Sequence, residues 1–283
     1  MRAKTTADAA GFSNPLTRAV SELSRPRKVQ KSLLLILGII SPEEVVFSRG
    51  MRATLFEFRH RWWVIFLIFC AAFAPYSFDP TNSGAAIVEW LARRFGAEPT
   101  VNWYRVIFAF GTLLLILAAC LRTWGTSYLR EEVMSDTRVR TERLLADGPY
   151  RHVRNPLYFG NILMAIGIGL MASRTGLLVL SVGMAVFVIR LILREEAELL
   201  KNQGDTYRQY CARVPMLMPS LLPRVTPAGT FPKWGQGFKV ELTNWLSAVA
   251  VGAFAVTLNA KLFWGIFAAS LLVRWTRKPR PSR

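Results

Sequence analysis

The sequence predicts an all-α integral membrane protein that is built as a multi-span helical bundle. Its 283 residues are 52% hydrophobic with a mean hydropathy of +0.27, yet they carry a formal net charge of +18. Apolar spans with basic flanks give this combination, which is unusual for a soluble domain. Four nearly uncharged stretches approach or reach the roughly 17 to 25 residues that cross a bilayer. We expect transmembrane helices at residues 62–75, 104–121, 157–173 and 176–193.

Both ends of the chain differ from this central part. Residues 245–258 and 260–273 are apolar but short, which predicts a C-terminal hairpin that crosses the membrane thinly or re-enters it. Residues 1–61 predict a basic cytosolic tail that leads to an interfacial helix, with a helix start at Ser41 and Pro42. The long basic leader without a small-residue cleavage site argues against a secretory signal peptide.

The distribution of Lys and Arg predicts the orientation. Four arginines precede the first span, whereas two arginines in the 76–103 loop are opposed by three acidic residues. The N-terminus should therefore be cytosolic, and residues 122–156 and 194–243 should return to that side. The basic residues predict contact with anionic lipid, so no nucleic-acid partner is expected. The predicted regions are the tail and interfacial helix (1–61), the first two spans (62–125), a core hairpin (126–220), and a basic linker with the C-terminal hairpin (221–283).

Several site types are not predicted. Cys70 and Cys120 lie within apolar spans and Cys211 lies on a cytosolic segment, so no disulfide framework is indicated. His60 and His152 are too few and too far apart to predict a metal site. The sequence also has no phosphate-binding GxxxxGK[ST] or GxGxxG motif and no internal repeat.

A first polar block, residues 147–161, opens the central hairpin. It begins with turn residues and places Pro156 early in the third span, which leaves the helix N-terminus with unpaired N–H groups. Arg154 adds a full positive charge, so a carboxylate would bind there. Tyr150 and Tyr158 offer aromatic faces for a heterocycle or a cation. The alternative is a juxtamembrane turn with interfacial tyrosines and a snorkelling arginine.

A second polar block lies where the fourth span leaves the membrane. Glu195 and Glu196 point about 100° apart on a helix, so one can face the first block while the other meets water or Arg194. Gly204 should end this helix. A solvated charge cluster is the alternative interpretation. Because charge near hydrocarbon is costly, we expect the two blocks to form one site for a small zwitterionic ligand.

The two blocks resemble the isoprenylcysteine carboxyl methyltransferase and phospholipid methyltransferase superfamily of integral membrane enzymes. The family pattern is G-x-Y-x-x-x-R-H-P-x-Y, a hydrophobic stretch, E-E-x-x-L, and a G-x-x-Y-x-x-Y-x-x-x-V-P tail. The resemblance covers roughly residues 105–220. It is carried by Gly148, Tyr150, Arg154, Asn155, Pro156, Tyr158, Glu195, Glu196, Leu199, Gly204, Tyr207, Tyr210, Val214 and Pro215.

This resemblance implies S-adenosylmethionine as the cofactor. The charge bias of the loops predicts that the site faces the cytosol. It implies that Arg154 and Glu196 lie close to the reaction. The residues that it implies around the cofactor are Tyr150, Asn155, Pro156, Leu157, Tyr158 and Glu195.

The sequence departs from the family at two positions. Asn155 stands where the family usually has His, which keeps hydrogen bonding but removes a titratable group. The prenylcysteine branch has an arginine one turn ahead of the acidic pair to hold the substrate carboxylate, and Leu191 occupies that position here. Arg190 or Arg194 is the predicted substitute, and Arg190 is therefore counted with the catalytic residues.

The predicted function is carboxyl O-methylation of a lipid-like, isoprenylcysteine-type acceptor that enters from the bilayer, on the inner membrane if the source is bacterial. A carboxylate is ionised near pH 7 and needs no base. One alternative is a phospholipid or small-molecule N- or S-methyltransferase, in which His152 or Glu196 would act as a base. Further alternatives are an NADPH-dependent membrane reductase of the steroid 5α-reductase type and a membrane scaffold without catalysis.

Overall fold

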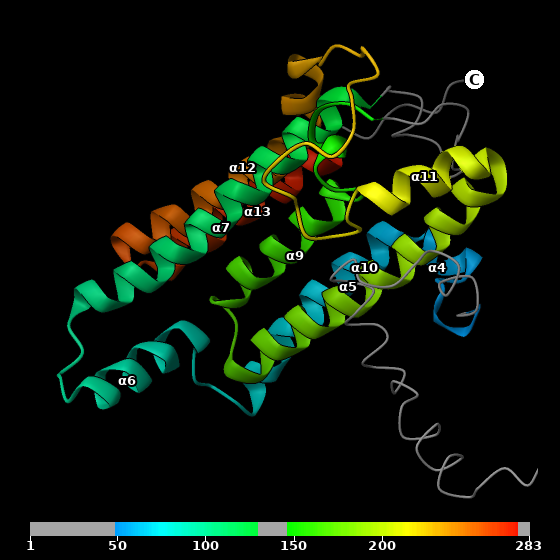
Figure 1. Cartoon of the computed structure of the whole chain (residues 1–283). Helices are drawn as coiled ribbons and strands as arrows, with labels where there is room; N and C mark the ends of the chain where they lie inside the picture. The colour runs from blue at the N-terminus through cyan, green and yellow to red at the C-terminus, as the bar shows by residue number, and fades with distance from the viewer. Residues whose placement is uncertain (1–48, 130–145, 277–283) are drawn as a thin grey trace, which may run out of the picture.

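Helices make up the architecture of the computed structural model, which describes residues 49–129 and 146–276 (Figure 1). Within these ranges the extended pairing is limited to an isolated bridge between Asn82 and Ser173. The predicted all-α class is thus confirmed for the described residues, while the predicted helix start at Ser41 lies outside them. The elements are η1 (Arg49–Met51), α4 (Leu55–Arg59), α5 (Arg61–Phe73), η2 (Ala74–Ser77), α6 (Ser83–Phe95), α7 (Val101–Tyr128), η3 (Gly148–Arg151), α9 (Pro156–Gly169), α10 (Arg174–Gln203), α11 (Asp205–Arg213), α12 (Trp234–Thr257) and α13 (Ala260–Thr276).

Three helices in the described part of the chain are long and apolar enough to cross a membrane. They are α7, α10 and α12, with 28, 30 and 24 residues. The apolar helices α5, α9 and α13 are shorter. Packing contacts connect neighbours in the order α13, α12, α7, α9, α10 and α5, so the helices form a row across the bundle (Figure 1). This arrangement is that of an integral membrane protein.

Two predicted span limits are corrected by the structure. Helix α7 continues to Tyr128, past the predicted end at residue 121, and α12 begins at Trp234, well before residue 245. The predicted short first arm of the C-terminal hairpin was therefore wrong. Arg122 and Glu241 interrupt the apolar runs in the sequence, but in the folded chain they pair with each other inside the bundle. Their charges consequently do not mark the limits of the helices.

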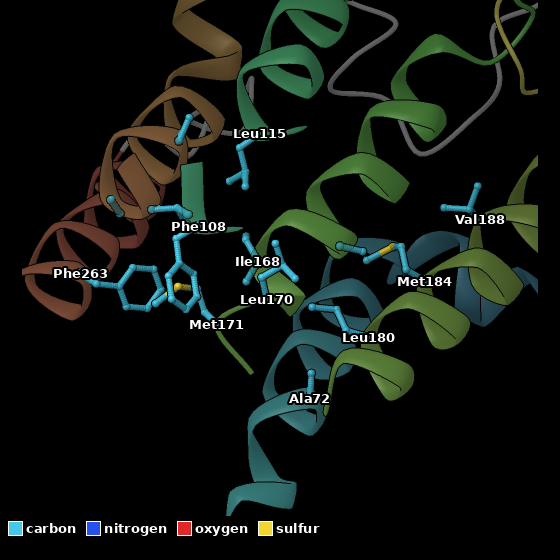
Figure 2. Close-up of a cluster of buried hydrophobic side chains, with 14 of the residues drawn as sticks. Ala72, Phe108, Leu115, Ile168, Leu170, Met171, Leu180, Met184, Val188 and Phe263 are labelled. Carbon is cyan, nitrogen blue, oxygen red and sulfur yellow. The ribbon is translucent and has the colours of Figure 1, made fainter. Parts of the chain in front are cut away.

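The helices meet around a continuous apolar core (Figure 2). Because lipid is as apolar as these side chains, close packing holds such helices together more than exclusion of water does. Gly111 and Gly167 allow α7 and α9 to approach, since a Cβ added at Gly167 would lie 2.8 Å from the Gly111 carbonyl oxygen. The fully buried residues at the centre include Leu115, Ile168, Leu180, Met184 and Val188.

The end of the bundle opposite the motif blocks is closed by polar contacts and by α6, a helix inside residues 76–103, where the sequence predicts a loop. Asn82 caps α6 by accepting from the Ala85 N–H at 3.0 Å. Asp79 accepts from Arg174 at 3.0 Å and from the Thr175 N–H at 2.9 Å. The turn between α9 and α10 is thereby fixed, and both motif blocks lie together at the other end of the bundle.

Candidate functional site

The Asp147 turn at the start of the first block is held by the linker that precedes α12. Burial would raise the pKa of Asp147, but hydrogen bonds from the linker lower it below the usual value of 3.8. The Asp147 carboxylate is therefore ionised, and it holds the linker beside the turn of the first block. The donors are the N–H groups of Thr230 at 2.8 Å, Ala228 at 2.7 Å and Gly229 at 3.3 Å.

The rest of the first block pairs with the chain that follows α11. The Arg154 N–H donates to the Pro215 carbonyl at 2.9 Å, and the Ser220 N–H donates to the His152 carbonyl at 2.9 Å. The Tyr210 hydroxyl donates to the carbonyl of Tyr150 at 2.7 Å. These contacts fix the backbone of the block and leave its later residues facing α10.

Arg154 is the central cation of the site. Its Nη1 donates to Glu196 Oε2 at 3.0 Å and lies 2.7 Å from Cys211 Sγ. The side chain is 9% exposed, and its Nε has no hydrogen-bond partner among the described residues. Burial would lower the pKa of Arg154, but the Glu196 carboxylate raises it above its ordinary value, so Arg154 stays charged. Burial also raises the pKa of the Cys211 thiol to about 11, which keeps that thiol neutral near pH 7.

Asn155 donates a hydrogen bond to the second carboxylate oxygen of Glu196. Its amide donates to Glu196 Oε1 at 3.0 Å and to the Met216 carbonyl at 3.0 Å. Glu196 is thus shared between a cation and a neutral amide. The amide that replaces the family's usual His therefore serves as a hydrogen-bond donor to the acidic pair.

Glu195 also faces the first block, because the Tyr158 hydroxyl donates to its Oε1 at 2.7 Å. The prediction that one of the two glutamates would meet water or Arg194 was wrong. Arg194 pairs instead with Glu198 at 3.2 Å. The reason is that the first block contacts α10 at two places. Arg154 and Asn155 contact Glu196, and Tyr158 in the first turn of α9 contacts Glu195, although the two glutamates point in different directions from α10.

The remaining predicted residues occupy other places. Pro156 is buried as the first residue of α9, as predicted. Leu157 lies toward α7, where its carbonyl accepts from Arg122 Nη1 at 3.1 Å. Arg190 donates to Glu57 of α4 at 2.7 Å, so the structure does not bring Arg190 to Arg154 and Glu196.

A buried polar cluster behind the first turn of α9 was missed by the sequence reading. Arg122 Nε and Nη2 donate to the two oxygens of Glu241 at 2.7 and 3.1 Å. Arg122 Nη1 donates to Asn161 Oδ1 at 2.6 Å, and the Asn244 amide donates to Glu241. The sequence feature that could have indicated this cluster is the presence of one basic residue, Arg122, and one acidic residue, Glu241, next to apolar stretches.

A cavity of about 390 Å³ lies beside the Asp147 turn, between η3, the end of α7 and the linker. Its lining includes Trp124, Tyr128, Arg151, His152 and Phe231. None of the residues implied for the cofactor lines it. His152 is held there by a 2.8 Å hydrogen bond between Nδ1 and the Ser220 carbonyl.

Comparisons with known proteins match the segment that contains this site. Residues 106–205 match the phospholipid methyltransferase family. A curated relative, protein-S-isoprenylcysteine O-methyltransferase from Schizosaccharomyces pombe, is 34% identical over 88 residues. That match covers 31% of this chain and 37% of the relative, so the chain matches little more than a third of the relative's length. No solved structure matches the chain.

The resemblance to the isoprenylcysteine carboxyl methyltransferase and phospholipid methyltransferase superfamily is therefore confirmed, and it covers residues 106–205, which match the family model. This segment contains the first block and both glutamates. The C-terminal helices α12 and α13 lie outside the matched segment, although α12 packs along α7.

Proposed function

We propose that this protein is an S-adenosylmethionine-dependent membrane methyltransferase that esterifies a carboxylate on a lipid-like acceptor. One observation carries the proposal: Arg154, Asn155 and Tyr158 hold both glutamates of α10 at one end of an apolar bundle. These residues lie in the segment that belongs to a methyltransferase superfamily. The name of the fission-yeast relative supports an S-isoprenylcysteine as the type of acceptor.

The residues present fit the proposed cofactor. The buried Nε of Arg154 is a donor that still lacks a partner among the described residues, and it suits a ligand carboxylate. Glu195 keeps acceptor capacity for an ammonium or a ribose hydroxyl. We propose that Tyr150, Asn155, Tyr158 and Glu195 contact the cofactor, and that Pro156 and Leu157 shape the site by fixing the start of α9. When bound, the cofactor would supply a methyl group on a positively charged sulfur.

A carboxylate acceptor suits the groups that surround Arg154. The Cys211 thiol is neutral near pH 7, because burial raises its pKa to about 11. Both carboxylate oxygens of Glu196 already accept hydrogen bonds, one from Arg154 and one from Asn155. A carboxylate is already ionised, so the reaction needs alignment in a dry site more than it needs proton transfer. We assign Arg154 and Glu196 to this alignment.

N-methylation of a phospholipid is the second candidate, because the family that residues 106–205 match is named for phospholipid methyltransferases. An amine acceptor would have to lose a proton before or during transfer. The acceptor must then be near a base that is free to accept that proton. Neither protein match is to a reductase, and no contact in the site favours a nicotinamide cofactor.

The decisive experiment uses the purified full chain in lipid nanodiscs. Saturation binding of radiolabelled S-adenosylmethionine is compared with that of NADPH, and labelled methyl transfer is then measured on N-acetyl-S-farnesylcysteine and on phosphatidylethanolamine. We expect S-adenosylmethionine binding and a product that releases labelled methanol in mild base, as a carboxyl methyl ester does. A base-stable product would identify an amine acceptor, and binding of NADPH alone would contradict the proposal.

A further inference from the structure

A second arginine, Arg61, lies over Phe58, in the apolar cluster against which Tyr158 packs, and forms no ion pair with a carboxylate in the described part of the chain. Arg61 is the first residue of α5. Its guanidinium carbon lies 4.8 Å from the ring centroid of Phe58 and 5.9 Å from that of Trp62. Its Nη1 makes a long 3.5 Å hydrogen bond to the Phe58 carbonyl. Ring stacking of this kind holds a guanidinium flat and leaves N–H groups at its edge available.

The neighbouring arginines at this end of the bundle are already paired. Arg190 pairs with Glu57 at 2.7 Å, and Arg194 pairs with Glu198 at 3.2 Å. Arg194 also lies over the Phe58 ring, at 5.5 Å. Of these three arginines, Arg61 alone forms no ion pair with a carboxylate of the described residues.

The helical phase of α5 directs Arg61 toward the site. Val64, Ile65 and Ile68 follow it by three, four and seven residues, so they share its face of the helix. These three side chains pack against the same cluster as Tyr158, which also contains Phe58. Tyr158, whose hydroxyl donates to Glu195 at 2.7 Å, therefore packs against the same cluster as the face of α5 that begins with Arg61.

The opposite side of Arg61 leads to the bilayer. Trp63, Phe66 and Leu67 on α5 are exposed large apolar side chains, as are Leu55 and Phe56 on α4. In a membrane protein such a surface meets lipid, where an unpaired charge is costly. Arg61 therefore stands between the lipid-facing surface of α5 and the glutamates of α10.

The two cations of the site thus have different surroundings. Arg154 lies beside Glu196 and Cys211, next to α11 and the chain that follows it. Arg61 begins α5 and lies over the Phe58 ring of α4, next to the exposed apolar side chains of both helices. A lipid-like molecule from the bilayer would meet Arg61 first, whereas a water-soluble cofactor from the cytosol would reach the Arg154 side.

We infer that Arg61 binds the anionic carboxylate of the lipid-like acceptor and positions it beside the Tyr158–Glu195 pair, while the acceptor's apolar chain lies along α5. This inference rests on the proposed function for the identity of the acceptor group. One carboxylate oxygen is held by the guanidinium and the other is free to react. That oxygen forms a bond to the methyl carbon of the cofactor while the carbon–sulfur bond breaks. The electron pair of the carbon–sulfur bond stays on the sulfur, and the acceptor becomes a neutral ester.

Loss of the negative charge gives the inference a direct consequence. A charge-assisted contact to Arg61 exists for the acid and is lost for the ester. Wild-type protein should therefore bind the acid more tightly than the ester, by about ten-fold or more, which is the range for a hydrogen bond to a charged partner. Loss of this contact on methylation would favour release of the ester product.

The test measures binding of N-acetyl-S-farnesylcysteine and of its methyl ester to the full chain in nanodiscs, without S-adenosylmethionine. We expect Arg61→Gln to bring the two affinities within about two-fold, since a neutral amide cannot replace an ionic contact. Arg61→Lys should keep part of the preference, because it keeps the charge. Arg59→Gln, which removes an exposed arginine two residues away, is the matched control and should retain the wild-type preference.

Binding of S-adenosylmethionine to the Arg61→Gln variant, measured in parallel, shows whether its site is intact and should be unchanged. A wild-type protein without preference for the acid, or an Arg61→Gln variant that keeps it, would overturn the inference. If the wild-type protein transfers a methyl group but the Arg61→Gln variant still binds the acid more tightly than the ester, the inference alone is contradicted. A preference that depends on Arg61 in a protein that neither binds S-adenosylmethionine nor transfers a methyl group contradicts the proposed function alone.

Discussion

Arg122 on α7 and Glu241 on α12 form a bidentate ion pair inside the helical bundle, with nitrogen–oxygen distances of 2.7 and 3.1 Å. Arg122 belongs to the segment that matches the family, whereas Glu241 lies in the C-terminal region outside it. The side chains are 8% and 1% exposed. The pair therefore fixes α12 to the part of the chain that contains the site.

Removal of one partner should destabilise the protein strongly, because it leaves the other charge buried and uncompensated. Glu241→Gln leaves the Arg122 charge buried without a counterion, and we expect a loss of about 3 to 5 kcal/mol in the free energy of unfolding. Unfolding by denaturant in detergent micelles measures it. Glu89→Gln, which removes an exposed ion pair with Arg93, is the control and should cost under about 1 kcal/mol. Equal stability of the two variants would contradict a structural role for the buried pair.

Glu195 is expected to contribute directly to cofactor binding. Glu195→Gln should weaken binding of S-adenosylmethionine by about 1.5 to 3 kcal/mol, because a hydrogen bond to a charged group is lost. Tyr158→Phe removes only the neutral donor to Glu195 and should weaken binding less. Calorimetry gives the affinities, with Glu198→Gln on the same helix as the control. An unchanged affinity in folded Glu195→Gln protein would end this assignment.

His152 separates the two types of acceptor. Its ring is bound to the Ser220 carbonyl at 2.8 Å, in the turn that packs on Trp124. For a carboxylate acceptor, His152→Gln should leave the turnover number within a fewfold and the rate flat from about pH 6 to 8. If His152 were the base for an amine or thiol, the substitution should cost about a hundredfold or more. A steep loss would therefore contradict carboxyl methylation.

The orientation of the site can be tested by labelling single cysteines in whole cells. The charge bias predicts that the linker before α12 is cytosolic and that the end of α6 is outside. A membrane-impermeant maleimide should modify a cysteine at exposed Ala97 and spare one at exposed Thr226, in a background without the native cysteines. The reverse pattern would place the site on the outer side.

Asp147 should make stability depend on pH at the acidic end. Its pKa is lowered in the folded state, so its stabilising effect is complete above the ordinary value of 3.8 and is lost as the pH falls through the lower folded value. Asp147→Asn should destabilise the protein at pH 7 by about 1 to 3 kcal/mol, because the amide keeps one acceptor oxygen where the carboxylate has two, so part of the linker N–H groups lose their acceptor. The difference in melting temperature between variant and wild type should shrink below about pH 4. A constant difference down to pH 2 would show that the charge of Asp147 does not matter.

The sequence determined the features that depend on local composition and spacing. Apolar runs located the helices of the bundle, the Asn-Pro pair set the start of α9 at Pro156, and Gly204 ended α10 with φ at +53°, a conformation that glycine adopts easily. The sequence also contains both motif blocks, and both lie within residues 106–205, the segment that matches the family model. Each of these features is set by residues near one another in the chain.

The tertiary structure decided which charges belong together. Hydropathy placed helix limits at Arg122 and near Glu241, because a single charge in an apolar run is costly while its partner is unknown. Those partners are 119 residues apart, and packing of α12 on α7 brings them together. The same reason explains why Arg190 was grouped with the site although it pairs with Glu57, and why Arg61 was not predicted as a site residue although it lies over Phe58, in the cluster against which Tyr158 packs. Helix periodicity gives the direction of a side chain, but only the packing of distant helices shows what that side chain meets.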